Sequence, residues 1–369
     1  MSTVLIACGG TGGHLAPGIA VAEELRERGC MPVLLISRKQ VDSALIRKYA
    51  SLDFHKAPGR SYAGDLISRC RALLDVVYGI LFSCKLIRRY RPSSVLLFGG
   101  FLSLGLGLAA RLLRVPVALH EANSQPGRAV RMLQPLASRI YLPEGVRLSG
   151  SPDSVRYCGY PVRRDIRPLP KDVARANLGL KTTGTLLVII GGSQGAESLN
   201  QWARENFPSL AEAGVSVYCV AGFGKVSEEN LVYDLSDGQT CTARFVAFTD
   251  QMGDVLSAAD LVISRAGAGA IAEMIRCRAP SVLIPYPYAA DNHQMANAEA
   301  HENEGAGVVL GQDRIDALLG TVQTLLGDSA RLASMRVQCE RLNAIDAARS
   351  TAEDLLALAT GEPAEDISS

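Results

Sequence analysis

The chain has 369 residues, of which 48% are hydrophobic and 20% charged, a composition typical of globular α/β proteins and not of disordered ones. This length is sufficient for two domains. The formal net charge is only +1, so the overall composition does not indicate a nucleic-acid-binding protein. The charge is nevertheless divided, because residues 1–165 contain 23 Lys and Arg against 11 Asp and Glu, and the remainder contains 15 against 26. This division predicts that one domain meets an anionic partner or surface, unless each domain simply has its own surface charge.

Short apolar runs alternate with helical patterns along the chain. In the first half the runs predict strands near residues 3–7, 33–37, 94–98, 117–120 and 139–142. In the second half they predict strands near residues 185–190, 215–221, 243–246, 260–264, 281–284 and 306–310. Helical patterns of ten or more residues separate most of these runs, as at residues 15–28, 197–213 and 292–303. The alternation predicts βαβ units, and so two mostly parallel sheets with helices on both faces.

A long uncharged stretch tests whether the chain crosses a membrane. It covers the 19 residues from Pro92 to Ala110 and contains three serines and four glycines. Its apolar part begins as the strand-like run Val95–Phe98. A buried strand, a Gly-Gly turn and a buried helix explain this composition better than a transmembrane span.

The two halves begin alike. Residues 4–14 and 186–196 each contain an apolar strand, a Gly-Gly pair, a hydroxyl residue and a further glycine before a helix, with the pairs 182 residues apart. The repetition predicts a duplicated domain architecture rather than a short-period repeat. Prolines and charges crowd at residues 161–171, which predicts a linker there. We therefore expect domains over residues 1–163 and 164–343, with a C-terminal helix over about 344–360 that packs back on the first.

Glycine-rich turns follow the first strand of each half. Glycine lets the backbone turn tightly and approach a ligand, and the N–H groups of the following helix bind phosphate. Two such loops suit a nucleotide diphosphate, or one diphosphate each. A dinucleotide-binding fold is not indicated, because Leu15 stands where the last glycine of G-x-G-x-x-G belongs. An ATP-type P-loop is not indicated either, because Val226 follows the only Gly-Lys pair.

Two histidines follow predicted strands of the first half. His14 ends the glycine loop at a helix start, where a neutral imidazole can act as a base toward an incoming hydroxyl, or else cap the turn or bind phosphate. His120, Glu121 and Asn123 follow the strand near residues 117–119, where open α/β sheets bind ligands. Adjacent His and Glu residues are common by chance, so the prediction of a functional site rests on their position after this strand.

The second half adds polar groups after two further strands. Residues 264–269 form a third strand–glycine–helix element. Glu273 in its helix can accept both hydroxyls of a ribose, or else lie solvated. After the strand at residues 281–284, two prolines stiffen a loop, and the next helix carries Gln294 and Asn297 on one face. Two amides one turn apart suit the hydroxyls of a sugar.

Together these motifs resemble the bacterial MurG family, the UDP-N-acetylglucosamine (UDP-GlcNAc) transferases that convert lipid I to lipid II in peptidoglycan synthesis. The resemblance runs in order from Val4 to about Gly307. It rests on Gly9–His14 with Pro17, Gly99-Gly100, His120-Glu121-x-Asn123, Gly159-x-Pro161-Val162-Arg163, Gly191–Gly195, Ala259–Gly267 and Asp291-x-His293-Gln294-x-x-Asn297-Ala298.

The resemblance implies a GT-B fold, in which two Rossmann-like α/β domains with parallel sheets face an interdomain cleft. The first domain is then expected to bind the acceptor and dock to the membrane, and the second to bind UDP-GlcNAc. The implied reaction is inverting transfer to the C4 hydroxyl of the lipid-linked N-acetylmuramoyl group, with no cofactor and no tightly bound metal. The implied nucleotide-sugar contacts are Thr11, Gly12, Gly13, Asn123, Arg163, Ser193, Gln194, Thr249 (by its backbone, against the uracil), Glu273, Gln294 and Asn297. His14 is the favoured base, with Glu121 as the alternative.

A few positions depart from the family pattern. Phe101 stands where Gly-Gly-Tyr is usual, which removes a phenolic contact to the acceptor, and Val130 stands where an asparagine is common. Ala270 and Ala272 replace hydroxyl residues in the helix of Glu273. None of these changes removes the expected donor site.

A short apolar segment with basic flanks predicts contact with an anionic membrane surface. The flanking residues are Arg69, Arg71, Lys85, Arg88, Arg89 and Arg91. The alternative is a core helix with basic ends. Nine cysteines without a C-x-x-C pair predict reduced thiols, and no basic leader precedes Val4, so we expect no secretory signal. Peripheral attachment at the cytoplasmic face of the cell membrane is therefore the expected location.

Other functions fit the same residues. A different GT-B enzyme would keep the donor residues and use another lipid or a natural product as acceptor. A UDP-GlcNAc 2-epimerase would act on the donor without any acceptor, and a non-catalytic scaffold would bind UDP and turn over nothing. The expected partners are UDP-GlcNAc, the lipid-linked acceptor, anionic lipids and other cell-wall synthesis proteins, with no nucleic acid.

Overall fold

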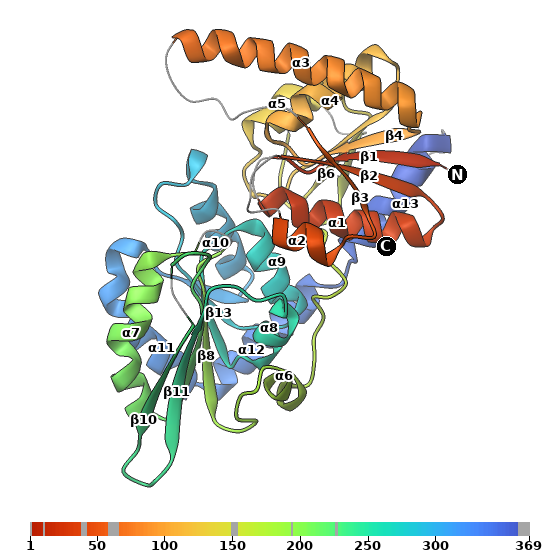
Figure 1. Ribbon diagram of the computed structural model, residues 1–369. Coiled ribbons are helices and arrows are strands. Elements are labelled where there is room, and N and C mark those ends of the chain that lie inside the picture. Colours follow the sequence, from red (N-terminus) through yellow and green to blue (C-terminus); the bar gives the residue numbers. More distant parts are fainter. Residues whose placement is uncertain are drawn as a thin grey trace. The chain divides into compact units, whose positions relative to one another are not determined.

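The computed structural model describes residues 2–9, 12–37, 43–57, 66–148, 154–192, 195–225 and 228–360, with the side chains of residues 12, 43, 44 and 66–74 left aside. The chain forms two compact units (Figure 1). The first comprises Met1–Arg164 with Ile345–Ser369, and the second comprises Asp165–Ala344. The chain thus passes from the first unit to the second within the proline-rich stretch at residues 161–171 and returns near the start of its last helix.

The sheet of the first unit is parallel throughout the described residues. Its strands lie in the order β3-β2-β1-β4-β5-β6-β7, and each neighbouring pair runs parallel. They are β1 (Thr3–Ala7), β2 (Met31–Ile36), β3 (Asp53–Lys56), β4 (Ser94–Leu97), β5 (Val117–His120), β6 (Arg139–Leu142) and β7 (Val155–Tyr157). Leu5 on β1 is paired with Val33 on β2 and with Val95 on β4. β1 is therefore an inner strand with an apolar neighbour on each side.

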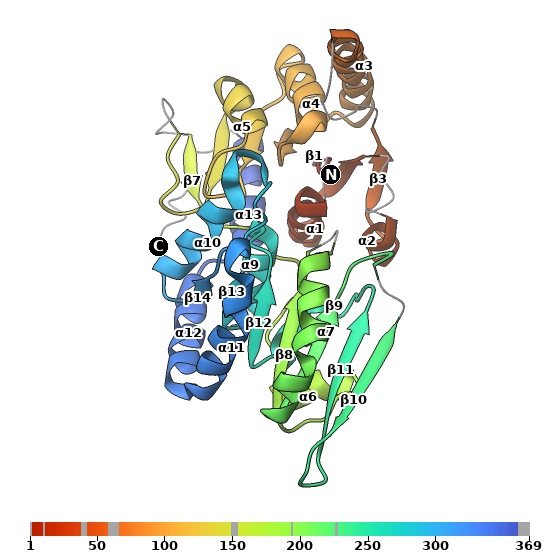
Figure 2. The ribbon, with the colours of Figure 1, turned by 90° about the vertical axis from the view of Figure 1, so that its left-hand side faces the viewer.

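Helices cover both faces of this sheet (Figures 1 and 2). Consecutive strand residues point to opposite faces, so Leu5 belongs to the core under α3, α4 and α5, whereas Val4 and Ile6 belong to the core under α1 and α13. All three side chains are completely buried. The helices are α1 (Gly12–Glu27), α2 (Ser43–Lys48), α3 (Leu66–Tyr90), α4 (Gly100–Leu112), α5 (Arg128–Leu133) and α13 (Ala347–Thr360), with the 3-10 helix η2 (Gln134–Leu136).

The C-terminal helix α13 completes the first unit. Leu355 is buried in the core that α1 also covers. The buried Asp354 accepts a hydrogen bond of 2.8 Å from the hydroxyl of Tyr141 on β6, and Arg139 forms an ion pair of 3.3 Å with the same carboxylate. Burial, together with Asp354, raises the pKa of Tyr141 well above its usual value, so its phenol remains a donor. A polar contact inside an apolar interface therefore fixes the register of this helix.

The sheet of the second unit has the order β10-β11-β9-β8-β12-β13-β14. Its pairs are parallel except β10 with β11, which is an antiparallel hairpin. The strands are β8 (Thr185–Ile190), β9 (Val215–Val220), β10 (Glu229–Asp234), β11 (Thr240–Val246), β12 (Leu261–Ser264), β13 (Ser281–Leu283) and β14 (Gly307–Val309). The helices are α6 (Lys171–Asn177), α7 (Glu197–Glu212), α8 (Met252–Ala258), α9 (Ala268–Arg276), α10 (His293–Asn303), α11 (Leu318–Gly327) and α12 (Ser329–Leu342), with η3 (Ala290–Asn292) and η4 (Gln312–Ala317).

The predicted strands are confirmed. All eleven are present in the described residues, with ends shifted by at most three residues. The prediction missed β3, β7 and β10, each of which lies at the edge of its sheet. The stretch from Pro92 to Ala110 forms β4 and α4 as expected. In the part of the chain that the structure describes, every helix is too short or too polar to cross a membrane.

Candidate active site

In both sheets the strand order reverses at the first strand of the unit. β1 lies between β2 and β4, and β8 lies between β9 and β12. Open α/β sheets bind ligands beyond the carboxyl ends of their strands at such a reversal, because the helices on the two sides diverge there. The glycine motifs predicted from the sequence follow β1, β4, β8 and β12, so they lie at these two positions.

His14 lies in the first turn of α1, beyond the end of β1. Its Nδ1 is 3.1 Å from the carbonyl oxygen of Gly9. Because a carbonyl oxygen only accepts hydrogen bonds, Nδ1 must carry the proton, and Nε2 is then the nitrogen that can accept one. The imidazole lies beside the turn after β4, since a Cβ added to Gly99 would be 3.9 Å from Nε2. The fold therefore selects one tautomer of a half-buried histidine.

The turn after β4 requires glycine for this arrangement. Gly100 has a φ of 73°, and a Cβ placed on it would lie 2.4 Å from the oxygen of Gly9. A side chain would therefore collide with the carbonyl that binds His14. Of the three other predicted contacts of this loop, Gly13 is exposed in the first turn of α1, Gly12 is described only as the first residue of that helix, and Thr11 lies outside the described residues.

His120 is a second imidazole of the first unit and stays neutral. Its Nε2 donates to the carbonyl oxygen of Gly159 at 3.0 Å, and its ring lies 5.0 Å from that of Phe98. Burial, and to a smaller extent the neighbouring His14, lower the pKa of His120 to about 4 despite that hydrogen bond. His120 therefore adds no positive charge beside His14 at neutral pH.

The carboxylate of Glu121 organises the loop that follows β5. One oxygen accepts from the backbone N–H groups of Ala122 and Asn123, both at 2.9 Å, and from the Asn123 side chain at 3.0 Å. The other oxygen accepts from the N–H of Gly127 at 2.6 Å. The residue is 4% exposed, and the carboxylate is the acceptor in all four hydrogen bonds. The geometry thus suits a loop-forming role, and Asn123 is turned toward this carboxylate.

In the second unit, two helices begin at the reversal without a side-chain cap. α7 follows β8, α9 follows β12, and neither Ala196 nor Gly267 at their N-cap positions supplies a capping group. Uncapped N–H groups at helix starts attract anions. The turn before α7 is tight, because Gly195 has a φ of 69° and a Cβ on it would lie 2.1 Å from the oxygen of Ala221. Ser193 and Gln194, predicted in this turn, lie outside the described residues.

Arg265 is a residue of this region to which the sequence analysis gave no role. Its guanidinium is buried and donates to the Ser198 hydroxyl and to the carbonyl of Ile284, both at 3.0 Å. It thereby joins the first turn of α7 to the loop after β13. Burial lowers its pKa, and its positive charge lies beside the uncapped start of α7. The signal that the sequence offered for this role was a single arginine at the end of an apolar strand.

The two predicted sugar contacts, Gln294 and Asn297, lie on one face of α10, and each side chain also forms a hydrogen bond within the protein. Gln294 accepts a hydrogen bond of 2.9 Å from the N–H of Tyr286, so its amide nitrogen is the part available to a ligand. Asn297 is 5% exposed and donates to the carbonyl of Ala266 at 3.2 Å, which ties α10 to the start of α9.

The remaining predicted residues lie on different elements of the chain. Glu273 is half-buried on α9, and Arg163 is half-buried in the segment between β7 and α6. Thr249 follows β11, and its hydroxyl accepts a hydrogen bond of 3.1 Å from the N–H of Gln251. Phe248 beside it stacks on Phe223 at 4.7 Å. Within the described segments, no three His, Cys, Asp or Glu side chains come together as metal ligands.

Two α/β units with glycine turns at their strand reversals are the architecture of GT-B glycosyltransferases. The sequence matches the N-terminal domain of glycosyltransferase family 28 over residues 4–142 and the C-terminal domain of that family over residues 186–353. The protein is therefore a glycosyltransferase. MurG of Acinetobacter baumannii has the same fold, with a TM-score of 0.72 at 22% identity over 96% of this chain and 99% of that one.

Curated relatives narrow the class further. A UDP-N-acetylglucosamine--N-acetylmuramyl-(pentapeptide) pyrophosphoryl-undecaprenol N-acetylglucosamine transferase of Opitutus terrae is 47% identical, over 96% of this chain and 94% of the relative. The transferase of the same name from Geobacter sulfurreducens is 35% identical, over 96% and 98%. The chain belongs to the MurG family of N-acetylglucosaminyltransferases, as the sequence motifs predicted.

The hydrogen bonds of Glu121 generate a test that separates a loop-forming role from a general base. Glu121→Gln places an NH₂ group against backbone donors, which costs about 1–3 kcal/mol for a buried group. We expect faster amide exchange over residues 122–127 by mass spectrometry. Glu144→Gln, at an exposed turn, is the matched control. Unchanged exchange with a kcat lower by about 10²–10⁴-fold would instead identify Glu121 as the base.

Proposed function

We propose that this chain transfers N-acetylglucosamine from UDP-GlcNAc to lipid I, the undecaprenyl-pyrophosphoryl N-acetylmuramyl-pentapeptide, in peptidoglycan synthesis. The observation that carries this function is the 47% identity to a transferase of that name, over 96% of this chain. Because the match runs through both units, it includes the regions expected to bind the donor and the acceptor. Family membership selects this transfer over 2-epimerisation and over a scaffold without activity.

The donor is proposed to bind the second unit. The uncapped starts of α7 and α9 and the buried Arg265 supply positive potential for the diphosphate, without a metal ion. Glu273 on α9 is proposed to accept hydrogen bonds from the ribose hydroxyls, and the backbone of Thr249 is proposed to contact the uracil. Further contacts are proposed for Ser193, Gln194, Gln294 and Asn297, and on the side of the first unit for Thr11, Gly12, Gly13, Asn123 and Arg163.

His14 is proposed as the general base. As the acceptor hydroxyl attacks the anomeric carbon from the face opposite UDP, Nε2 takes the proton while Nδ1 keeps its hydrogen bond to Gly9. The resulting imidazolium is not opposed by His120, which burial keeps neutral. Negative charge develops on the departing diphosphate, where helix N–H groups and Arg163 are proposed to stabilise it. Inversion at the anomeric carbon follows from this single displacement.

One assay tests the activity and the ribose contact together. Labelled UDP-GlcNAc should give lipid-linked disaccharide only when lipid I is present, whereas conversion of the donor alone would support the epimerase alternative.

Glu273→Ala should raise the donor KM about tenfold and narrow the discrimination against the 2′-deoxy donor, because a charge-assisted hydrogen bond is worth about 1.5–3 kcal/mol. Glu299→Ala, exposed on α10, is the control. Unchanged discrimination would leave Glu273 without a ribose contact.

The role of His14 is tested with two variants. His14→Ala removes the imidazole, and His14→Asn keeps an amide donor for Gly9 but has no basic nitrogen. We expect both to lower kcat by about 10²–10⁴-fold, with UDP affinity measured by calorimetry nearly unchanged. Weaker UDP binding with nearly normal turnover at saturation would make His14 a phosphate ligand instead.

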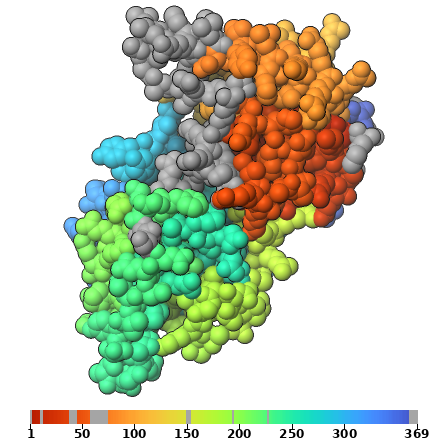
Figure 3. All heavy atoms as spheres, viewed as in Figure 1, coloured from red at the N-terminus to blue at the C-terminus, as the bar shows by residue number. Residues whose placement is uncertain are grey.

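The first unit is proposed to dock to the cytoplasmic face of the membrane through α3. Val77, Tyr78 and Leu81 are 48%, 57% and 63% exposed, and Arg88 and Arg89 are exposed further along the same helix. The spacings of three, four and seven residues place Tyr78, Leu81, Lys85 and Arg88 along one face. Figure 3 shows this part of α3, in orange, at the molecular surface. An apolar patch followed by arginines suits an interface with anionic lipids.

Vesicle binding tests this docking face. Arg88→Ser with Arg89→Ser should weaken binding to anionic vesicles by about 1 kcal/mol per arginine, roughly thirtyfold for the pair. Arg314→Ser with Arg331→Ser, exposed in the second unit, is the matched control. Equal cosedimentation of both double variants with the wild type would contradict docking through α3. Cell-wall synthesis proteins remain proposed partners at the same membrane.

A further inference from the structure

The segment that leaves the first unit is bound along α1. After β7, Tyr160 donates a hydrogen bond of 3.1 Å from its hydroxyl to the carbonyl of Gly13, in the first turn of α1. Four residues later, Arg164 binds the other end of that helix. Its Nε is 2.8 Å from a carboxylate oxygen of Glu24, and a terminal nitrogen is 2.5 Å from Glu27. The segment 160–164, called the strap below, is thus held at both ends of one helix.

The lengths show that the strap can reach both contacts. Gly13 and Glu24 are eleven residues apart, about 16 Å along a helix. Four residues of extended chain span at most about 14 Å, and the two side chains supply the remainder. Arg163 precedes the second contact directly, and His14 follows Gly13 directly. The two residues proposed to stabilise charge and to accept the proton are therefore attached to the same rigid element.

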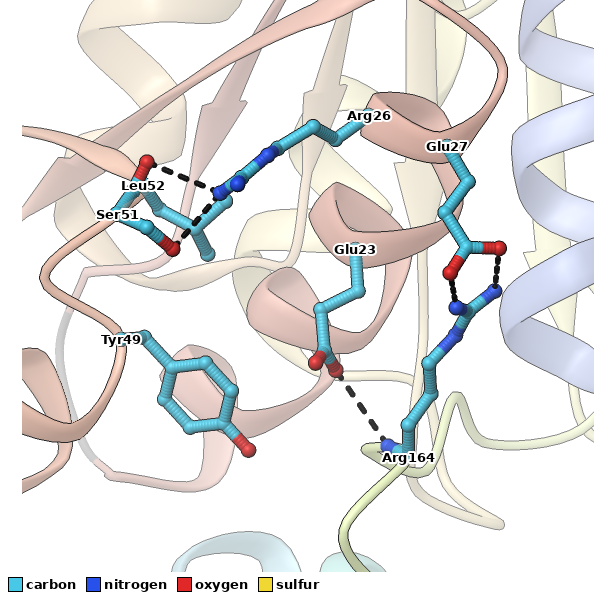
Figure 4. Close-up of a pocket in the computed structure, with 7 residues that line it drawn as sticks. All are labelled: Glu23, Arg26, Glu27, Tyr49, Ser51, Leu52 and Arg164. Carbon is cyan, nitrogen blue, oxygen red and sulfur yellow. Dashed lines mark hydrogen bonds and ion pairs between the residues drawn. The ribbon is translucent and has the colours of Figure 1, made fainter.

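The arginine contact is ionic rather than closely packed. A cavity of about 300 Å³ adjoins Arg164 and is lined by Glu23, Arg26, Glu27, Tyr49, Ser51, Leu52 and Arg164 (Figure 4). In that view the Arg164 guanidinium faces the carboxylate of Glu27, and its backbone N–H points to Glu23. Because one side of the arginine faces a cavity, van der Waals contact alone does not fix its position.

The same charges hold the returning chain. Glu24 is 6% exposed and also accepts a hydrogen bond of 2.5 Å from Arg28. Arg28 in turn binds Glu353 on α13 at 2.7 Å. Burial raises the pKa of the Glu353 carboxyl, but its hydrogen bonds to Arg28 and Arg349 outweigh this and lower it. One ionic network at the end of α1 therefore anchors both passages of the chain between the units.

We propose that Tyr160 and Arg164 are positioning residues that bind the strap to α1, so that Arg163 and His14 are held on one rigid element. The proposal rests on the functions proposed for His14 and Arg163. It adds that their geometry is set by the side chains at the two ends of the strap. Losing either contact should release the strap while leaving both sheets intact.

The test uses three variants: Tyr160→Phe, Arg164→Gln and the double variant that carries both substitutions. The control is Arg167→Gln, which removes an exposed linker charge in the second unit. We expect Arg164→Gln and Tyr160→Phe each to lower kcat, Arg164→Gln by about ten- to hundredfold, since a misplacement of about 1 Å has such an effect. The donor KM should change by less than about threefold. The double variant should lose less than the product of the single losses, because one release already frees the strap.

Amide exchange gives a readout independent of turnover. Exchange over residues 160–164 should accelerate in Tyr160→Phe and Arg164→Gln and not in Arg167→Gln. A lower melting temperature with unchanged kcat, or kcat losses that multiply in the double variant, would overturn the positioning role. If the wild type makes no lipid-linked product, the proposed function fails, and the exchange measurement still decides whether the strap is held as described.

Discussion

Both candidate sites depend on how closely two backbones approach where a buried parallel strand turns into a helix. Gly100 lies against the carbonyl of Gly9, and Gly195 lies against that of Ala221, each at a separation that excludes a Cβ. The first contact leaves the Gly9 oxygen in place to bind His14 and so selects the tautomer of the imidazole. The second brings the start of α7 to the end of β9. Side-chain chemistry at these sites is therefore a consequence of backbone packing.

The sequence predicted the inner strands because they are buried on both faces and appear as continuous apolar runs. The edge strands β3 and β7 are short and only partly buried, so their composition does not separate them from loops. β10 is different, since its residues alternate between half-buried and exposed along Glu229–Asp234. That alternation is the pattern of a strand with one covered face. The residue types do not show this alternation, because the exposed Val232 is apolar and lies between Leu231 and Tyr233.

Residue type and position predicted where polar groups gather, but not which of these groups form hydrogen bonds within the protein. Glu121, Gln294 and Asn297 all lie at carboxyl ends of strands or just beyond, yet each accepts or donates hydrogen bonds within its own unit. Such contacts depend on loop conformations that no spacing rule supplies. Arg265 was missed for the complementary reason, because a buried arginine shows its function only when its acceptors are known. The position of a motif is thus more predictable than the role of each atom in it.

The return of α13 to the first unit has a consequence for synthesis of the chain. Asp354 and Leu355 complete a core that Val4 and Ile6 begin, so this core contains contacts between residues about 350 positions apart. During translation the first unit emerges with one sheet face only partly covered, and the second unit can fold before that face is closed. Contacts of such sequence separation form slowly. The nascent protein therefore exposes an apolar surface next to α1 until its last helix has left the ribosome.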